Sequence, residues 1–143
     1  MSAAPFTARV RLGDTNATGC VDGVTLLVLF EAARADGLRA VGLPYDEIVA
    51  RGLNALTIEA KLKNHGCARV DDLLCVHMRV TEVGRLRFSF AYDVRRQSDD
   101  ALIASGQTLH ICLDHATGQP ARVTDWLRDG LNQLSGGPPE TSG

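Results

Sequence analysis

Residues 22–35 read DGVTLLVLFEAARA, and this stretch decides the fold of the chain. Asp22 is a typical helix N-cap and the run Gly42-Leu43-Pro44 is a typical helix end, so a helix is expected from about residue 22 to about residue 41. Its first two turns are apolar on every side, which is typical of a helix enclosed by other elements. The sequence therefore predicts one long central helix.

Strands are predicted before and after this helix, because apolar and polar residues alternate there with a period of two. In one of these runs, Leu56, Ile58, Ala60 and Leu62 are expected to share one apolar face. The predicted strands are 6–12, 56–63, 74–81, 86–95 and 101–114, and two shorter helices are predicted at 45–50 and 124–134.

One strand, one buried helix and several long antiparallel strands predict an α+β fold in which the sheet wraps around the helix. Residues 1–134 are expected to form a single domain, followed by a flexible C-terminal tail at 135–143 that is poor in apolar residues. A single curled sheet leaves edge strands unpaired. We therefore expect the chain to associate with itself, as a homodimer or a homotetramer.

The composition of the 143 residues is that of a soluble globular protein, with 45% hydrophobic and 22% charged residues. Fifteen Lys and Arg residues against 17 Asp and Glu give a formal charge of −2, without the basic surface that nucleic-acid binding needs. The N-terminus does not resemble a secretion signal, and the most apolar window, residues 24–30, is too short to cross a bilayer. We expect a cytoplasmic protein that binds neither nucleic acid nor membranes.

The cysteines are scattered along the chain, at Cys20, Cys67, Cys75 and Cys112. They form no C-x-x-C pair, and no histidine pair has the spacing of zinc ligands. The sequence therefore predicts no metal site and no disulfide framework, and four reduced thiols of the kind found in cytoplasmic proteins.

Six short motifs, in this order, resemble the hotdog-fold acyl-CoA thioesterases of the 4-hydroxybenzoyl-CoA thioesterase type, from about Phe6 to Leu131. The resemblance implies a hotdog fold and hydrolysis of an acyl-CoA or acyl-carrier-protein thioester. Coenzyme A is then part of the substrate, and no cofactor is expected. The motifs are residues 13–19 (GDTNATG), 30–34 (FEAAR), 71–72 (DD), 87–90 (RFSF), 106–110 (GQTLH) and 117–120 (TGQP).

The chain departs from that type at one important position, because members of the type usually carry a catalytic Asp where this sequence has Asn16. An amide cannot act as a nucleophile or a general base. The sequence is also similar to the phenylacetyl-CoA thioesterase-like branch, in which an acid follows the loop amide by fifteen positions. Here that acid is Glu31. The His-Gly-Gly usual in that branch is incomplete, because Asp22 replaces the His before Gly23.

The chemistry that this resemblance implies centres on Glu31, as nucleophile or as general base toward water. The Gly23 N–H, at the positive end of the central helix, is expected to bind the carbonyl oxygen. Asn16 is expected to orient the water or the carboxylate. Substrate contacts are further expected from Gly19 and Asp22, from Thr57 and Asn64 (supplied by a neighbouring subunit), and from Arg87 to the phosphates of coenzyme A.

Each of these residues also has a simpler interpretation. Glu31 and Arg34 have the spacing of an ion pair within a helix. Asn16 is a normal turn residue, Asp22 a normal cap, and Arg87 a normal solvent-exposed strand residue. His110 is expected to be structural. At the level of function, a non-hydrolytic protein that binds acyl-CoA or acyl-carrier protein remains the alternative, and a hotdog dehydratase is disfavoured because no His precedes Glu31.

Overall fold

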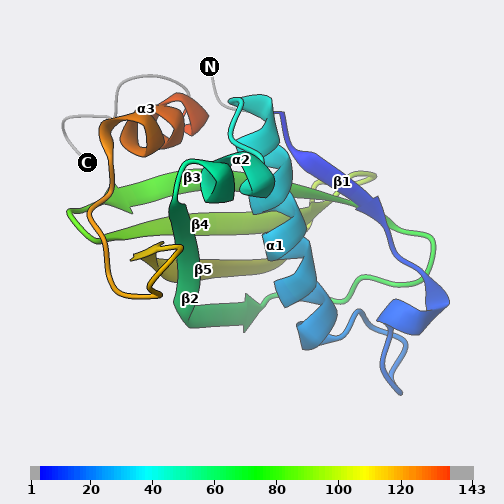
Figure 1. Cartoon of the computed structure of the whole chain (residues 1–143). Coiled ribbons are helices and arrows are strands. Elements are labelled where there is room, and N and C mark those ends of the chain that lie inside the picture. The colour runs from blue at the N-terminus through cyan, green and yellow to red at the C-terminus, as the bar shows by residue number, and fades with distance from the viewer. Residues whose placement is uncertain (1–3, 136–143) are drawn as a thin grey trace.

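The structure is a computed structural model that describes residues 4–135 of the chain (Figure 1). It confirms an α+β architecture with one long helix and one antiparallel sheet. The strands are β1 (Phe6–Arg9), β2 (Leu53–Asn64), β3 (Leu73–Val83), β4 (Arg87–Arg96) and β5 (Leu102–Asp114), and the helices are the 3-10 turn η1 (Leu12–Asp14), α1 (Gly23–Ala40), α2 (Tyr45–Ala50) and α3 (Asp125–Leu134). Residues 136–143 of the expected tail lie outside the described residues.

The five strands form one sheet in the order β1-β3-β4-β5-β2, and α1 lies across one face of it (Figure 1). The centre of this packing is a stack of Phe30, from α1, on Tyr92, from β4, with ring centroids 4.3 Å apart. Gly106 of β5 permits this close approach, because a Cβ there would collide with the Phe30 ring and with the carbonyl oxygen of Lys61. This contact therefore sets the distance between α1 and the sheet.

The prediction that α1 is enclosed on every side is wrong for the described chain. The sheet covers one side, where Leu26 and Phe30 are fully buried, whereas Val24 and Val28 on the other side are 67% and 55% exposed. A single sheet cannot surround a helix that it packs against from one face. The chain consequently presents an apolar helix surface to its surroundings.

The predicted facing of β2 is also wrong in its first half. A β-bulge lies between Thr57 and Glu59 in the pairing of β2 with β5, so the alternation shifts by one residue there. Leu56 and Ile58 are therefore exposed. Thr57 pairs instead with His110 of β5, in the row of side chains that faces α1. Sequence alternation alone cannot reveal such a shift.

The first strand is shorter than predicted. It ends at Arg9, and the 3-10 turn η1 takes up Leu12, which is exposed rather than part of an apolar strand face. Asp14 closes this turn by accepting hydrogen bonds from the main chain and the side chain of Arg11. These bonds hold the pKa of Asp14 below its usual value.

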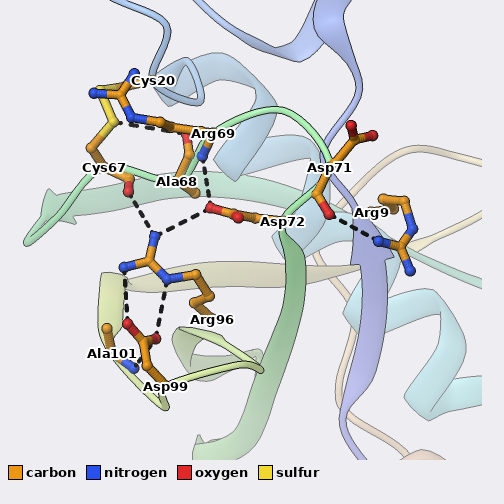
Figure 2. Close-up of polar contacts among 10 residues, drawn as sticks. All are labelled: Arg9, Cys20, Cys67, Ala68, Arg69, Asp71, Asp72, Arg96, Asp99 and Ala101. Carbon is orange, nitrogen blue, oxygen red and sulfur yellow. Dashed lines mark hydrogen bonds and ion pairs between the residues drawn. A yellow bond between two sulfur atoms is a disulfide. The ribbon is translucent and has the colours of Figure 1, made fainter.

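The cysteine prediction is corrected by a disulfide between Cys20 and Cys67 (Figure 2). The two residues are 47 positions apart in sequence, and the fold brings their loops together through a hydrogen bond from Val21 N–H to the carbonyl oxygen of Ala68. Cys75 and Cys112 are free thiols, as expected. The argument from reduced thiols to a cytoplasmic location does not hold for the bonded pair.

The loop that carries Cys67 is tied to the sheet by Arg96 at the end of β4 (Figure 2). The Arg96 guanidinium donates to the carbonyl oxygen of Cys67 at 3.0 Å and to the carboxylate of Asp72 at 3.2 Å, and it pairs with Asp99 at 3.1 Å. The pKa of Asp72 lies below its usual value, first because its carboxylate accepts the Arg69 N–H and then because Arg96 adjoins it. The disulfide and Arg96 together join the loop before α1 to the loop between β2 and β3 and to the end of β4.

No helix within residues 4–135 combines the length and the apolar character that crossing a bilayer requires.

Candidate active site

A surface groove of about 270 Å³ runs along the first turns of α1, between that helix and strands β2 and β5. Its walls are largely apolar, and its polar groups come from two residues of α1 and two strand residues. The apolar lining residues are Val24, Leu27, Val28 and Ala60, and the polar ones are Glu31, Arg34, Thr57 and Thr108. An apolar groove with few polar groups is the usual form of a small-molecule site.

The structure places Glu31 in this groove, and Glu31 forms no ion pair with Arg34. Arg34 takes part in no ion pair within residues 4–135, so the ion-pair interpretation of Glu31 is wrong for the described chain. Its side chain turns inward, is 8% exposed, and donates to the Tyr92 hydroxyl at 3.0 Å. Glu31 itself is exposed, so the apolar surroundings that we expected for it are incomplete in a single chain.

A buried series of polar side chains lies directly beneath the groove. From Arg34 it passes through the hydroxyl of Tyr92 to Thr108, over 2.6 Å between the two oxygens, and from Thr108 to Nε2 of His110 over 2.8 Å. Nδ1 of His110 then meets Oγ1 of Thr57 at 3.0 Å. The series begins and ends at residues that line the groove.

Burial determines the protonation of this series. Desolvation, followed by the nearby Arg34 charge, lowers the pKa of His110 from 6.5 to about 4, so the imidazole is neutral near pH 7. Desolvation also raises the pKa of Tyr92, and its phenol stays protonated. For Arg34, burial acts to lower the pKa, but the Tyr92 and Tyr45 hydroxyls outweigh it and the net pKa is raised. The guanidinium is therefore a buried positive charge.

The buried, hydrogen-bonded position of His110 agrees with the prediction that it is structural. It is 4% exposed and has a hydroxyl partner on each ring nitrogen. The sequence gives only a weak signal for this series of polar side chains. Tyr92, Thr108 and His110 carry hydrogen-bonding groups at positions of predicted strands where the neighbouring buried residues are apolar. Thr57, which we expected from a neighbouring subunit, joins the groove from the same chain as Glu31.

The start of α1 offers free backbone donors, as predicted. Within residues 4–135 the Gly23 N–H has no hydrogen-bond acceptor, and a Cβ at Gly23 would lie 3.2 Å from Cδ2 of Leu62. Asp22 occupies the N-cap position, but its side chain makes no capping bond and its carbonyl oxygen accepts from Leu26 N–H. The Asp22 carboxylate is thus not committed to the helix.

Asn16 acts as a turn residue in the structure. Its Oδ1 accepts from Thr18 N–H at 3.0 Å, from the Thr18 hydroxyl at 2.7 Å and from Cys20 N–H at 3.3 Å. Gly19 completes this loop with φ of +80°, a conformation that glycine adopts without strain. Neither Asn16 nor Gly19 lines the groove that contains Glu31.

Two further predicted residues lie apart from the groove. Asn64 is the last residue of β2, paired with Ala104. Arg87 begins β4 opposite Ile111 and is exposed, while its neighbour Phe88 is buried, so Arg87 points away from α1. Neither residue is among those that line the groove with Glu31.

Comparison with known proteins gives a consistent result over almost the whole fold. Residues 10–131 match the thioesterase-like superfamily. The chain is 31% identical over 129 residues to a 1,4-dihydroxy-2-naphthoyl-CoA hydrolase of Synechococcus elongatus. The alignment covers 86% of this chain and 93% of that protein.

Solved structures agree. A Thermus thermophilus protein is 30% identical and superposes with a TM-score of 0.84, covering 92% of this chain and 99% of that one. A 1,4-dihydroxy-2-naphthoyl-CoA thioesterase of Synechocystis shares the fold with a TM-score of 0.83 at 21% identity, covering 92% and 96% of the two chains. The chain therefore belongs to the thioesterase-like superfamily of hotdog-fold thioester hydrolases.

Proposed function

We propose that this chain hydrolyses acyl-CoA thioesters in the groove along α1, with Glu31 as the reacting carboxylate. The observation that carries the proposal is the presence of Glu31 in an otherwise largely apolar groove with hydroxyl donors beside it. Glu31 either attacks the thioester carbonyl carbon or removes a proton from a water molecule that attacks it. Both routes need a hydrogen-bond donor at the carbonyl oxygen.

We propose the acyl group of the substrate from the substrates that the names of the relatives give. A substrate of the kind named for them, an aromatic hydroxyacyl-CoA, is consistent with a groove that has apolar walls and a few polar groups. An acyl-carrier-protein thioester presents the same reacting bond and belongs to the same proposal. The predicted cytoplasmic location stays a prediction.

Release of free thiol from a panel of acyl-CoA thioesters tests this function. The panel contains 1,4-dihydroxy-2-naphthoyl-CoA, benzoyl-CoA, and short and long aliphatic acyl-CoAs. We expect release of one thiol per acid formed from at least one aromatic member. If none of the thioesters is cleaved while the chain still binds coenzyme A, the non-hydrolytic binding function is correct instead.

We further propose that two copies of the chain complete each site. The helix rise separates Gly23 from Glu31 by about 12 Å along α1, whereas a hydrogen bond and an attacking atom on one carbonyl span roughly 6 Å. Gly23 also does not line the groove that contains Glu31, so we infer that the Gly23 N–H that serves a given Glu31 comes from the second copy. The exposed Val24 and Val28 of α1, close to the edge strand β2, supply an apolar surface for a second copy.

Mixing two inactive variants tests this shared site. Gly23→Pro removes the N–H at the first helical position, where proline is well tolerated, and Glu31→Gln removes the carboxylate. After the two proteins are unfolded and refolded together, a mixed dimer has one site with both changes and one intact site. We expect about a quarter of the wild-type activity to return in an equimolar mixture. Activity that stays at the level of the separate variants would contradict the shared site.

A further inference from the structure

The buried series that links Arg34 to Thr57 has a direction, and the direction follows from which atoms can donate. An arginine guanidinium only donates, so the Tyr92 oxygen accepts from Arg34. Within residues 4–135 the remaining partner of the Tyr92 hydroxyl is Oγ1 of Thr108. The phenol proton therefore points to Thr108, since any other arrangement would leave it buried without an acceptor.

The same reasoning continues to the groove. Thr108 accepts from Tyr92, and in the tautomer of His110 that carries its proton on Nδ1 the Thr108 proton points to Nε2 of His110. A neutral imidazole that accepts at Nε2 carries its proton on Nδ1, and this proton points to Oγ1 of Thr57. The Thr57 hydroxyl accepts from His110, and its own proton is free to point into the groove that contains Glu31.

We propose that Thr57 is a catalytic residue whose hydroxyl donates a hydrogen bond to the carbonyl oxygen of the bound thioester, and that His110, Thr108, Tyr92 and Arg34 are positioning residues that fix the direction of this bond. The inference rests on the proposed function. It assigns a donor for the carbonyl oxygen from the same chain as Glu31, in addition to the backbone of a second copy.

The reaction uses this donor in a balanced sequence. When water adds to the carbonyl carbon, it gives one proton to the Glu31 carboxylate, and the π electrons of the C=O bond move onto the oxygen that Thr57 contacts. When the C=O bond re-forms, the C–S bond breaks and the leaving sulfur takes the proton from Glu31. If Glu31 itself attacks, the same carbonyl oxygen becomes negative. The Thr57 donor serves both routes.

The buried positive charge of Arg34 strengthens the hydrogen bonds of the series. Each hydroxyl and the imidazole accept a hydrogen bond from the side of Arg34 and donate one toward Thr57. Each hydrogen bond therefore polarises the next one, and the Thr57 hydroxyl becomes a stronger donor. In this tautomer of His110, Thr57 is not a nucleophile that His110 activates. Nδ1 of His110 already holds a proton and cannot accept the Thr57 proton.

Replacement of Thr57 tests the donor. Thr57→Val keeps the shape of the side chain and removes the hydroxyl, and we expect kcat to fall about 100-fold with KM nearly unchanged. Thr57→Ser restores the hydroxyl and should recover kcat to within about tenfold of the wild type. Thr81→Val is the matched control, because Thr81 also bonds a neighbouring strand through its hydroxyl, to Ser89 at 2.7 Å, away from the groove.

Tyr92→Phe tests the series itself. It removes the hydrogen bond from Arg34 and the hydrogen bond to Thr108, and it keeps the ring that stacks on Phe30. We expect kcat to fall roughly tenfold in the wild-type background, because the Thr57 proton is no longer held in one direction, and to change little in the Thr57→Val background. Equal effects of Tyr92→Phe in both backgrounds would show a merely structural role and overturn the assignment of the series.

Failure of this inference is distinguishable from failure of the proposed function. If the wild-type chain cleaves acyl-CoA but Thr57→Val retains full kcat, Thr57 is not the donor and hydrolysis at Glu31 stands. If the wild-type chain cleaves no thioester on the panel, the proposed function fails first. Thermal unfolding of each variant verifies that a loss of kcat does not come from a loss of fold.

Discussion

Glu31→Gln is expected to lower the rate of acyl-CoA hydrolysis at least about 100-fold while leaving the fold intact. The amide fills the same space as the carboxylate, but it can neither attack the carbonyl carbon nor accept a proton from water. Glu31 is exposed and makes no ion pair within the described chain, so its replacement removes no structural contact. Thiol release under saturating acyl-CoA measures the effect, and the thermal midpoint verifies the fold.

The matched control for this experiment is Glu82→Gln. Glu82 is also an exposed glutamate in a regular element, but it lies on β3, outside the groove. Its replacement makes the same change of net charge and should leave the rate of hydrolysis unchanged. A full rate in the Glu31 variant would show that another group activates the nucleophile, and the assignment of Glu31 would be wrong.

The free energy of unfolding is expected to fall by up to about 3 kcal/mol as the pH is lowered from about 6.5 to about 4. Desolvation and the Arg34 charge keep His110 neutral in the folded chain until about pH 4, whereas the unfolded chain protonates it near its ordinary value of 6.5. Between these two values the unfolded state binds more protons, so acid favours unfolding. Urea unfolding at a series of pH values measures this slope.

His110→Gln should remove this part of the pH dependence, although the variant will itself be less stable. His77→Gln, at an exposed position on β3, is the control and should retain the slope. The hydrogen-bonded carboxylates of Asp14, Asp72 and Asp99 have lowered pKa values, so their contribution to stability is lost at more acidic pH, below the ordinary carboxyl value of 3.8. A wild-type stability that is flat from pH 6.5 to 4 would contradict a buried neutral His110.

The sequence predicted the parts of the fold that depend on local pattern. The apolar run after Asp22 predicted α1 within one or two residues, and alternation predicted β3, where Leu74 and Val76 are buried as expected. These features depend on residues that are close together in the chain.

The sequence did not predict the features that depend on pairing between distant segments. The bulge after Thr57 decides that this hydroxyl faces His110, and it is visible in the pairing with β5 alone. The disulfide joins Cys20 to Cys67 because two loops meet, not because of their spacing. The sequence could not distinguish the exposed side of α1 from its buried side, because Val24 and Val28 on one side and Leu26 and Phe30 on the other are all apolar.

The position of a bound substrate analogue tests the central claim most directly. In a ketone analogue, a CH2 group replaces the thioester sulfur of an acyl-CoA, so it binds as the substrate does and cannot be hydrolysed. In a crystal structure of the complex, we predict that the ketone carbon lies within about 3.5 Å of the Glu31 carboxylate or of a water molecule that it holds. A ketone bound elsewhere, with Glu31 facing only solvent, would contradict the account.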